Sequence, residues 1–425
     1  MQIELIIFIA MVAVFFISTF ALHLPVSLGM VLASIVGSIV SGHGIQFRHL
    51  VEGMFGYIDT ILVIATAMIF MKVFEGSGAL QQLNNTILRR FHNKKILLLI
   101  LLMIIVMFPG MITGSSTAAV LSAGAIVAPV FMKMGISKQK SGAIIAIGAI
   151  AGMIAPPVNV PAMIIGGGID LPYVGFTLPL LLLSLPVAIF TVLFLGLKEA
   201  KSFDYDESIR TGELVVEENK YGFKLYIPLI VVLLLMILTK TFPQTIPDLG
   251  MSLIFIIGAI IGIFTGDKIN IVNTSKAAIK DVLPVMGILM GVGMFIQIMT
   301  FTGVRGLIVN AALSMPSSLL YLSIALMLPA FGAVSSFGSA SVLGVPFVLA
   351  LIGQNEIVTA AALSLIAGLG DLVPPTALAG IFAAQVVKEE NYAKVLKYCR
   401  IPALVILAWG LVFVIFAKPI ASMIF

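Results

Sequence analysis

Long apolar runs, separated by short polar segments, follow one another along the whole chain. Many of these runs reach the length of about 18 residues at which an apolar helix spans a bilayer. We therefore predict an all-α polytopic membrane protein with about 11 transmembrane segments and two re-entrant helical hairpins. The predicted unbroken spans lie at about 4–22, 25–41, 57–76, 174–197, 225–242, 250–265, 282–300 and 401–417.

One apolar stretch interrupts its own helix. Residues 108–129 read FPGMITGSSTAAVLSAGAIVAP, in which the Pro-Gly pair at 109–110 is expected to stop the preceding helix and residues 114–116 to form a bendable polar tip. Backbone that leaves a helix at membrane depth must be buried in protein or line a wet cavity, because lipid cannot satisfy its N–H and C=O groups. The pattern predicts a re-entrant hairpin over about 96–134.

The second half of the chain repeats this pattern. Residues 328–348 read LPAFGAVSSFGSASVLGVPFV, and the serine pair at 335–336 follows the pair at 115–116 at an offset of about 220. We predict a second hairpin over about 317–353. Repetition at a fixed offset favours paired structural units over helices that are merely kinked and packed through Gly, Pro and Ser.

Each predicted hairpin is followed by a helix that breaks. The breaks are GMIAPPVNVP at 152–161 and GLGDLVPPTALAG at 368–380, and the Pro-Pro pairs at 156–157 and 374–375 correspond at an offset of about 218. Interrupted apolar segments at corresponding positions of two halves are a pointer to the binding site of a transporter.

The distribution of Lys and Arg predicts how the chain is threaded through the membrane. An N-terminus outside the cell places every basic loop in the cytoplasm, as the positive-inside rule requires. These loops are 89–95, 133–140, 198–224, 267–280 and 388–400. The weakly basic segments then lie outside, namely 43–56, 244–249 and 303–316. The two hairpins enter from opposite faces, which defines an inverted-topology repeat.

This repeat gives the predicted domain organisation. Residues 1–197 form the first inverted repeat, 198–224 a cytoplasmic linker, and 225–425 the second inverted repeat. Residues of roughly 96–170 and 317–385 are expected to form a moving block that carries the site. The remaining helices form a scaffold, which the interfacial segments 43–56 and 78–92 brace.

Composition excludes several other classes of protein. The chain is 60% hydrophobic and only 10% charged, with a mean hydropathy of +1.18, which no soluble domain requires. The net charge of +5 reflects basic loops. The single cysteine, Cys399, excludes an internal disulfide and a cysteine metal site. No P-loop motif is present, so no ATP hydrolysis is expected. Residues 4–22 are interpreted as a retained helix because no basic segment or cleavage signal flanks them.

The tips and breaks offer oxygen ligands for a cation. Unwound carbonyls and Ser/Thr hydroxyls suit Na⁺, so we predict one Na⁺ site in each half, built from a tip and the adjacent break. The candidate ligands, some acting through backbone carbonyls, are Ser115, Ser116, Thr117 and Gly152 in the first half and Ser335, Ser336, Ser339, Gly370 and Thr376 in the second. The alternative for each serine is a hydrogen bond back to its own helix.

An acidic residue lies in the second break. Asp371 is ionisable at membrane depth, which marks it as a functional candidate that could ligate a cation, carry a proton or pair with substrate; the alternative is a helix cap. Helix N-termini suit an anionic substrate group. The predicted substrate contacts are Ser115, Ser116, Pro157, Asn159, Ser336, Asp371 and Thr376.

Lys72 and Glu75, on the predicted span 57–76, are expected to form an ion pair and to snorkel toward the membrane surface. No arginine is evident near either tip.

With these motifs, the chain resembles the large membrane (M, DctM-like) subunit of TRAP transporters, the tripartite ATP-independent periplasmic systems of the ion transporter superfamily. The resemblance rests on GMITGSSTAAVLSAGAIVAP, AGMIAPPVNVPAMIIGG and GLGDLVPPTALAGIFAAQVV, and it covers nearly the whole chain. It implies Na⁺-driven import of carboxylates such as dicarboxylates by an elevator movement in the bacterial inner membrane. It also implies two partners, a small four-helix membrane subunit and a periplasmic substrate-binding protein. The serine-rich second tip, VSSFGSAS, departs from the family pattern.

Three alternatives remain open at this point. A self-contained carboxylate symporter or exchanger of the same superfamily would need no binding protein. A membrane enzyme would need a nucleophile and a base, and the four histidines all fall outside the predicted tips. A passive channel would not move its substrate against a gradient.

Overall fold

Helices account for the regular secondary structure of the residues that the computed structural model describes, which are 2–201, 220–242, 244–351, 353–374 and 376–425. The first half contains α1 (Gln2–Phe16), η1 (Ile17–Ala21), α2 (Val26–Ser38), η2 (Ile39–His43), α3 (Phe47–Phe55), α4 (Ile58–Gly76), α5 (Ala79–Phe91), α6 (Lys95–Thr113), α7 (Ser116–Ala119), η3 (Val120–Gly124), α8 (Ala125–Lys133), α9 (Lys138–Ile154), α10 (Val160–Gly168) and α11 (Thr177–Gly196).

The second half follows with η4 (Gly222–Tyr226), α13 (Ile227–Thr241), α14 (Gly250–Ile263), α15 (Ile271–Phe301), α16 (Val304–Leu313), α17 (Ser317–Gly332), α18 (Ser336–Ser339), η5 (Ala340–Gly344), α19 (Val345–Ala350), α20 (Glu356–Gly368), η6 (Leu369–Leu372), α21 (Leu378–Val386), α22 (Tyr392–Ile415) and α23 (Ala417–Ile424). Most of the predicted linker, and Pro375 of the second Pro-Pro pair, lie outside the described residues.

Within the described residues, eight helices are long and apolar enough to cross a membrane, and a ninth span results if the bent pair α3 and α4 counts as one. The protein is therefore a multi-pass, all-helical membrane protein. The number falls below the predicted 11 partly because α14, which covers the predicted span at 250–265, is a shorter apolar helix. Broken helices also fail a test for continuous length, which is expected where a segment turns back inside the membrane.

Three predicted boundaries are wrong. Helix α6 continues through the Pro-Gly pair at 109–110 and ends at Gly114, which has a positive φ of 64°. A proline forfeits only one backbone hydrogen bond, whereas a left-handed glycine is a common helix terminus. Helix α15 begins at Ile271 and α22 at Tyr392, inside segments expected to be basic loops, because an N-cap asparagine starts each helix early, at Asn270 and Asn391.

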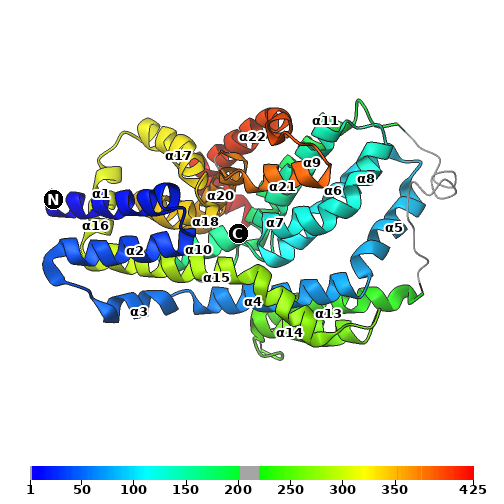
Figure 1. Ribbon diagram of the computed structural model, residues 1–425, viewed down its shortest axis with the longest axis horizontal. Coiled ribbons are helices and arrows are strands. Elements are labelled where there is room, and N and C mark those ends of the chain that lie inside the picture. The colour runs from blue at the N-terminus through cyan, green and yellow to red at the C-terminus, as the bar shows by residue number, and fades with distance from the viewer. Residues whose placement is uncertain (1, 202–219, 243, 352, 375) are drawn as a thin grey trace.

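The two hairpins are built alike. In each, a serine N-cap starts a four-residue helix, which passes into a five-residue π-helix and then into a further α-helix. The elements α7 and η3 are displaced from α18 and η5 by 220 residues at every boundary. Figure 1 shows α6 and α8 to the right of the centre of the molecule, α17 to the left, and α7 and α18 near the centre.

The helices divide into two layers (Figure 1). In one layer the long helix α15 packs against α2, α3 and α4, and α14 packs between α4 and α13. In the other, α9 packs against α6, α11, α21 and α22, and α20 packs against α10, α17 and α22. The packing therefore groups α11 and α22 with the hairpins, although the sequence analysis assigned them to the scaffold.

Candidate functional site

The serine of each hairpin tip caps the short helix that follows it. The Ser115 Oγ accepts a hydrogen bond from the Ala118 N–H at 3.2 Å, and the Ser335 Oγ accepts one from the Gly338 N–H at 3.2 Å. N-cap serines satisfy N–H groups that lack a partner within the helix. The two tips thus share one local geometry, and their predicted serines begin the second arm of each hairpin.

The next residue of each tip meets a single carboxylate. Ser116 donates a short hydrogen bond from its Oγ to the Oδ2 of Asp371, and Ser336 lies beside the same carboxylate. All three residues are 5% exposed or less. Asp371 belongs to η6, in the break between α20 and α21. The structure therefore brings together the first tip, the second tip and the second broken helix, which are far apart in the sequence.

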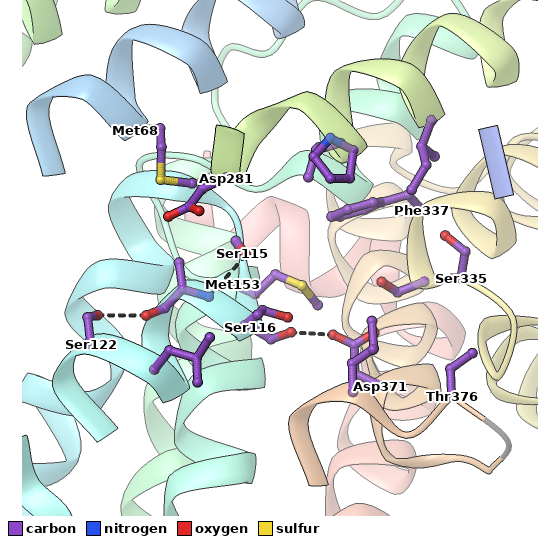
Figure 2. A pocket seen from close by; sticks show the side chains of 18 of the residues that line it. Met68, Ser115, Ser116, Ser122, Met153, Asp281, Ser335, Phe337, Asp371 and Thr376 are labelled. Carbon is purple, nitrogen blue, oxygen red and sulfur yellow. Dashed lines mark hydrogen bonds between the residues drawn. The ribbon is translucent and has the colours of Figure 1, made fainter. Parts of the chain in front are cut away.

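A cavity of about 590 Å³ lies at this junction. The predicted residues that line it are Ser115, Ser116, Thr117, Ser335, Ser336, Asp371 and Thr376. Figure 2 shows Asp371 and Thr376 on one side, Asp281 and Met68 on the opposite side, and Ser115 and Ser116 between them. A cavity of this size, mostly apolar and with a few converging polar groups, suits a small molecule.

Thr376 and Ser339 make hydrogen bonds within the second hairpin region. The Thr376 Oγ1 donates to the Ala333 carbonyl at 2.5 Å, which ties the break to the second tip while Thr376 also lines the cavity. The Ser339 Oγ donates to the Leu328 carbonyl at 2.6 Å and is fully buried. Ser339 does not line the cavity, so its side chain joins the two arms of the hairpin.

The Asn159 side chain forms hydrogen bonds to residues on both sides of the first break. Its Oδ1 accepts from the Ala162 N–H at 2.9 Å, and its Nδ2 donates to the Ile154 carbonyl at 2.8 Å and to the Ser364 Oγ at 2.9 Å. The side chain is fully buried and lies outside the cavity lining. Pro157, which follows Pro156 through a cis peptide bond, also lies outside it. The structure thus gives Asn159 a positioning role and does not bring either predicted contact to the cavity.

The glycines of the two breaks are sites of close backbone approach. A Cβ on Gly152 would lie 2.3 Å from the Met107 carbonyl oxygen of α6, and a Cβ on Gly370 would lie 2.3 Å from the carbonyl carbon of Gly332 at the end of α17. Each break therefore packs directly against the first arm of its own hairpin. The close backbone contact is sufficient reason for a glycine at each position, with no need of a bound ligand. Neither glycine lines the cavity.

One charged group of residues lining the cavity was not predicted from the sequence. Lys72 Nζ lies 2.9 Å from an oxygen of Asp281 and 3.4 Å from one of Glu75, and all three residues line the cavity. The Lys72–Glu75 pair was predicted from helical spacing. Asp281 falls between the predicted basic loop at 267–280 and the predicted span at 282–300 and was given no role, because only the packing of α15 against α4 shows that it faces Lys72.

The described residues contain no group of three or more His, Cys, Asp or Glu side chains that could hold a metal ion. The oxygen atoms at Asp371 are one carboxylate and two hydroxyls. A hydroxyl that donates to a carboxylate keeps lone pairs that can face a cation. The donor set consists of oxygen atoms alone and therefore fits a hard cation better than a soft transition metal.

The fold and the site define a polytopic helical transporter, and comparisons with known proteins agree. A family model described as the tripartite ATP-independent periplasmic transporter, DctM component, matches residues 106–420. The chain belongs to this family. A second model, the Na⁺/H⁺ antiporter family, matches residues 2–197. As a component of a transporter, the chain is not an enzyme.

Among solved structures, the chain is similar in fold to the YdaH transporter of Alcanivorax borkumensis, which is reported to have an unusual topology. The TM-score is 0.63 at 15% sequence identity, and the match covers 87% of each chain. A comparison with curated proteins found no match.

Proposed function

We propose that this protein imports a small organic acid, driven by Na⁺, as the large permease subunit of a tripartite transporter. The observation that carries the proposal is the convergence of both hairpin tips on Asp371 inside a cavity of metabolite size. An ionisable residue that is buried between the two tips is the group to which a coupling ion would bind.

The charge of the cavity explains why an anion would need a cation with it. Its lining carries three carboxylates, on Glu75, Asp281 and Asp371, and one ammonium group, on Lys72. An organic anion entering alone would meet a net negative wall in a medium of low dielectric constant. Na⁺ bound among Asp371, Ser116 and Ser336 would cancel one of these negative charges and so weaken that repulsion. Since linkage is reciprocal, the bound anion would raise the affinity for Na⁺ by the same factor.

The two packed layers support an elevator movement. The cavity lies between α4, α5 and α15 on one side and the hairpins and η6 on the other, so its walls belong to both layers. We propose that the hairpin layer moves past the α15 layer and carries the site with it. The lining of the cavity includes Leu121, Ser122 and Ile126, which lie along the second arm of hairpin 1. Under the predicted topology, this arm leads to the cytoplasm.

The inverted repeat belongs to the same proposal. Its units would be residues 1–197 and 225–425, joined by a cytoplasmic linker at 198–224. The identical offset of the two tips supports it. The family is a component of a tripartite system, so the proposed partners are a small four-helix membrane subunit and a periplasmic substrate-binding protein. The proposed location is the bacterial inner membrane with the N-terminus outside.

Uptake into proteoliposomes tests this function. The purified protein, reconstituted with its candidate small subunit, would receive labelled organic acids with the binding protein, under an inward Na⁺ gradient or a matched K⁺ gradient. Uptake should require Na⁺ and should be abolished by Asp371→Asn. The matched control is Asp248→Asn, which alters an exposed carboxylate in the loop before α14. Na⁺-independent uptake, or equal uptake by both variants, would contradict the proposal.

A second candidate function is a self-contained exchanger that couples Na⁺ to H⁺ or to an acid without a binding protein. The match of residues 2–197 to the Na⁺/H⁺ antiporter family favours it. The same proteoliposomes separate the two functions. Uptake that is unchanged when the binding protein is left out, together with Na⁺-driven proton movement without any organic acid, would select the exchanger.

A further inference from the structure

The charged wall opposite the tips carries the one basic side chain among the described residues that line the cavity. Lys72 lies on α4, and its ammonium group contacts Asp281 on α15 at 2.9 Å and Glu75, three residues further along α4, at 3.4 Å. Asp281 lies across the cavity from Asp371 in Figure 2. The wall therefore belongs to the α15 layer, whereas the tips belong to the hairpin layer.

The ammonium group is not saturated by these two partners. A lysine has three N–H donors, and a direct hydrogen bond between nitrogen and oxygen spans about 2.7–3.2 Å. The contact with Asp281 falls within this range, whereas the contact with Glu75 exceeds it. Glu75 is thus the partner that an arriving carboxylate replaces most easily. Such an exchange leaves Lys72 paired, and the displaced Glu75 side chain, which is 23% exposed, can be solvated by water.

We infer that Lys72 is a specificity-determining contact for the anionic group of the substrate, and that Glu75 and Asp281 compete with the substrate for it. The inference rests on the proposed function, because it requires an anionic substrate. It extends the proposed binding site from the tips of the hairpin layer to the α15 layer, which would also contact the substrate. Because the two carboxylates weaken the hold of Lys72 on an anion, the trio sets how readily the substrate leaves the cavity on this side.

A snorkelling or purely structural ion pair is the competing interpretation, and it predicts a different pattern. If the trio only joins α4 to α15, removing any member weakens the fold and lowers transport in the same direction. If the trio holds the substrate, removing the ammonium weakens binding, whereas removing a competing carboxylate strengthens it. The sign of the effect therefore separates a binding role from a structural one.

The test uses Lys72→Met, Glu75→Gln and Asp281→Asn in the full chain, reconstituted as above. Lys140→Met is the matched control: this lysine is also ion-paired, with Glu199, and its side chain is 22% exposed against 28% for Lys72, but it does not line the cavity. The readouts are the KM for uptake of the transported acid, compared with an analogue that has one carboxylate fewer, and the thermal shift that the acid produces in detergent.

Lys72→Met should raise the KM by roughly ten- to a hundredfold, as the loss of one charge-assisted hydrogen bond gives, and the analogue should be affected less. Glu75→Gln and Asp281→Asn should lower the KM several-fold and enlarge the thermal shift. A KM for Lys72→Met equal to that of Lys140→Met, or a KM raised by all three substitutions, would overturn the inference and leave the proposed function standing. No uptake of any organic acid by the unmodified protein would overturn the proposed function itself.

Discussion

The close contact between Gly370 and Gly332 predicts how strongly a methyl group at position 370 would disturb the site. Gly370→Ala would place a methyl group 2.3 Å from the carbonyl carbon and 2.4 Å from the Cα of Gly332. Both neighbours are backbone atoms, which cannot turn aside as a flexible side chain does. Ordinary contacts begin near 3.4 Å, so the end of α17 and the break at η6 must separate by about 1 Å.

The expected cost of this substitution follows from overpacking. Forcing one extra methyl group into a packed interior costs about 1–3 kcal/mol. Gly370 precedes Asp371 directly, so the displacement reaches the carboxylate on which both tips converge. A shift of about 1 Å is enough to misplace a site whose supporting contacts are tight. We therefore expect a melting temperature lower by a few degrees and a strong loss of Na⁺-dependent uptake.

The matched control for this prediction is Gly306→Ala. Gly306 lies in α16, and a Cβ built on it meets nothing within 4 Å. Alanine stabilises a helix interior by up to about 1 kcal/mol relative to glycine, so this variant should be as stable as the unmodified protein or slightly more stable. The assays are thermal unfolding in detergent and uptake into proteoliposomes. Equal melting temperatures and equal uptake for the two variants would refute the close packing of the break against its hairpin.

Three further predictions concern the caps, the first break and a loop ion pair. Ser115→Ala and Ser335→Ala should each cost about 1 kcal/mol of stability and weaken the Na⁺ dependence of uptake, because each cap positions the neighbouring hydroxyl of Ser116 or Ser336; unchanged Na⁺ dependence in both would show that the caps do not position the ion site. Asn159→Ala should lower the melting temperature through at least one unsatisfied buried group, costing about 1–3 kcal/mol, while the KM stays the same. Hydrogen bonding from Lys140 lowers the pKa of Glu199, so Glu199→Gln should cost at most about 1 kcal/mol at neutral pH, and the difference from the unmodified protein should disappear as the pH falls through that lowered pKa.

The hairpins could be predicted from the sequence because each half carries the same local pattern. A capping serine and the run of small residues that follows it are encoded within about ten residues. The pattern recurs at an offset of 220, as the structure has it. Capping signals act within a few residues of the helix end that they define, so the position of both tips could be predicted without a structure.

The side-chain partners that these elements meet in the folded protein could not be predicted from the local sequence. Asp281 and Lys72 lie more than two hundred residues apart, and only the packing of α15 on α4 brings them together. Likewise, the bond from Asn159 to Ser364 shows that this asparagine faces α20, whereas its place in a broken helix pointed to the substrate. Side-chain direction around a break depends on tertiary contacts, for which one sequence carries no periodic signal.

Direct measurement of Na⁺ binding to the purified protein tests the central claim that Asp371 and the two tip hydroxyls form a cation site. Equilibrium binding of radioactive Na⁺ would compare the unmodified protein with Asp371→Asn and Ser116→Ala, and with Ser341→Ala. Ser341 is a buried serine that donates to the Gly338 carbonyl of its own hairpin arm and lies outside the cavity lining. Our account predicts saturable binding that Asp371→Asn abolishes, Ser116→Ala weakens and Ser341→Ala leaves unchanged. Equal Na⁺ affinity in all four proteins would contradict it.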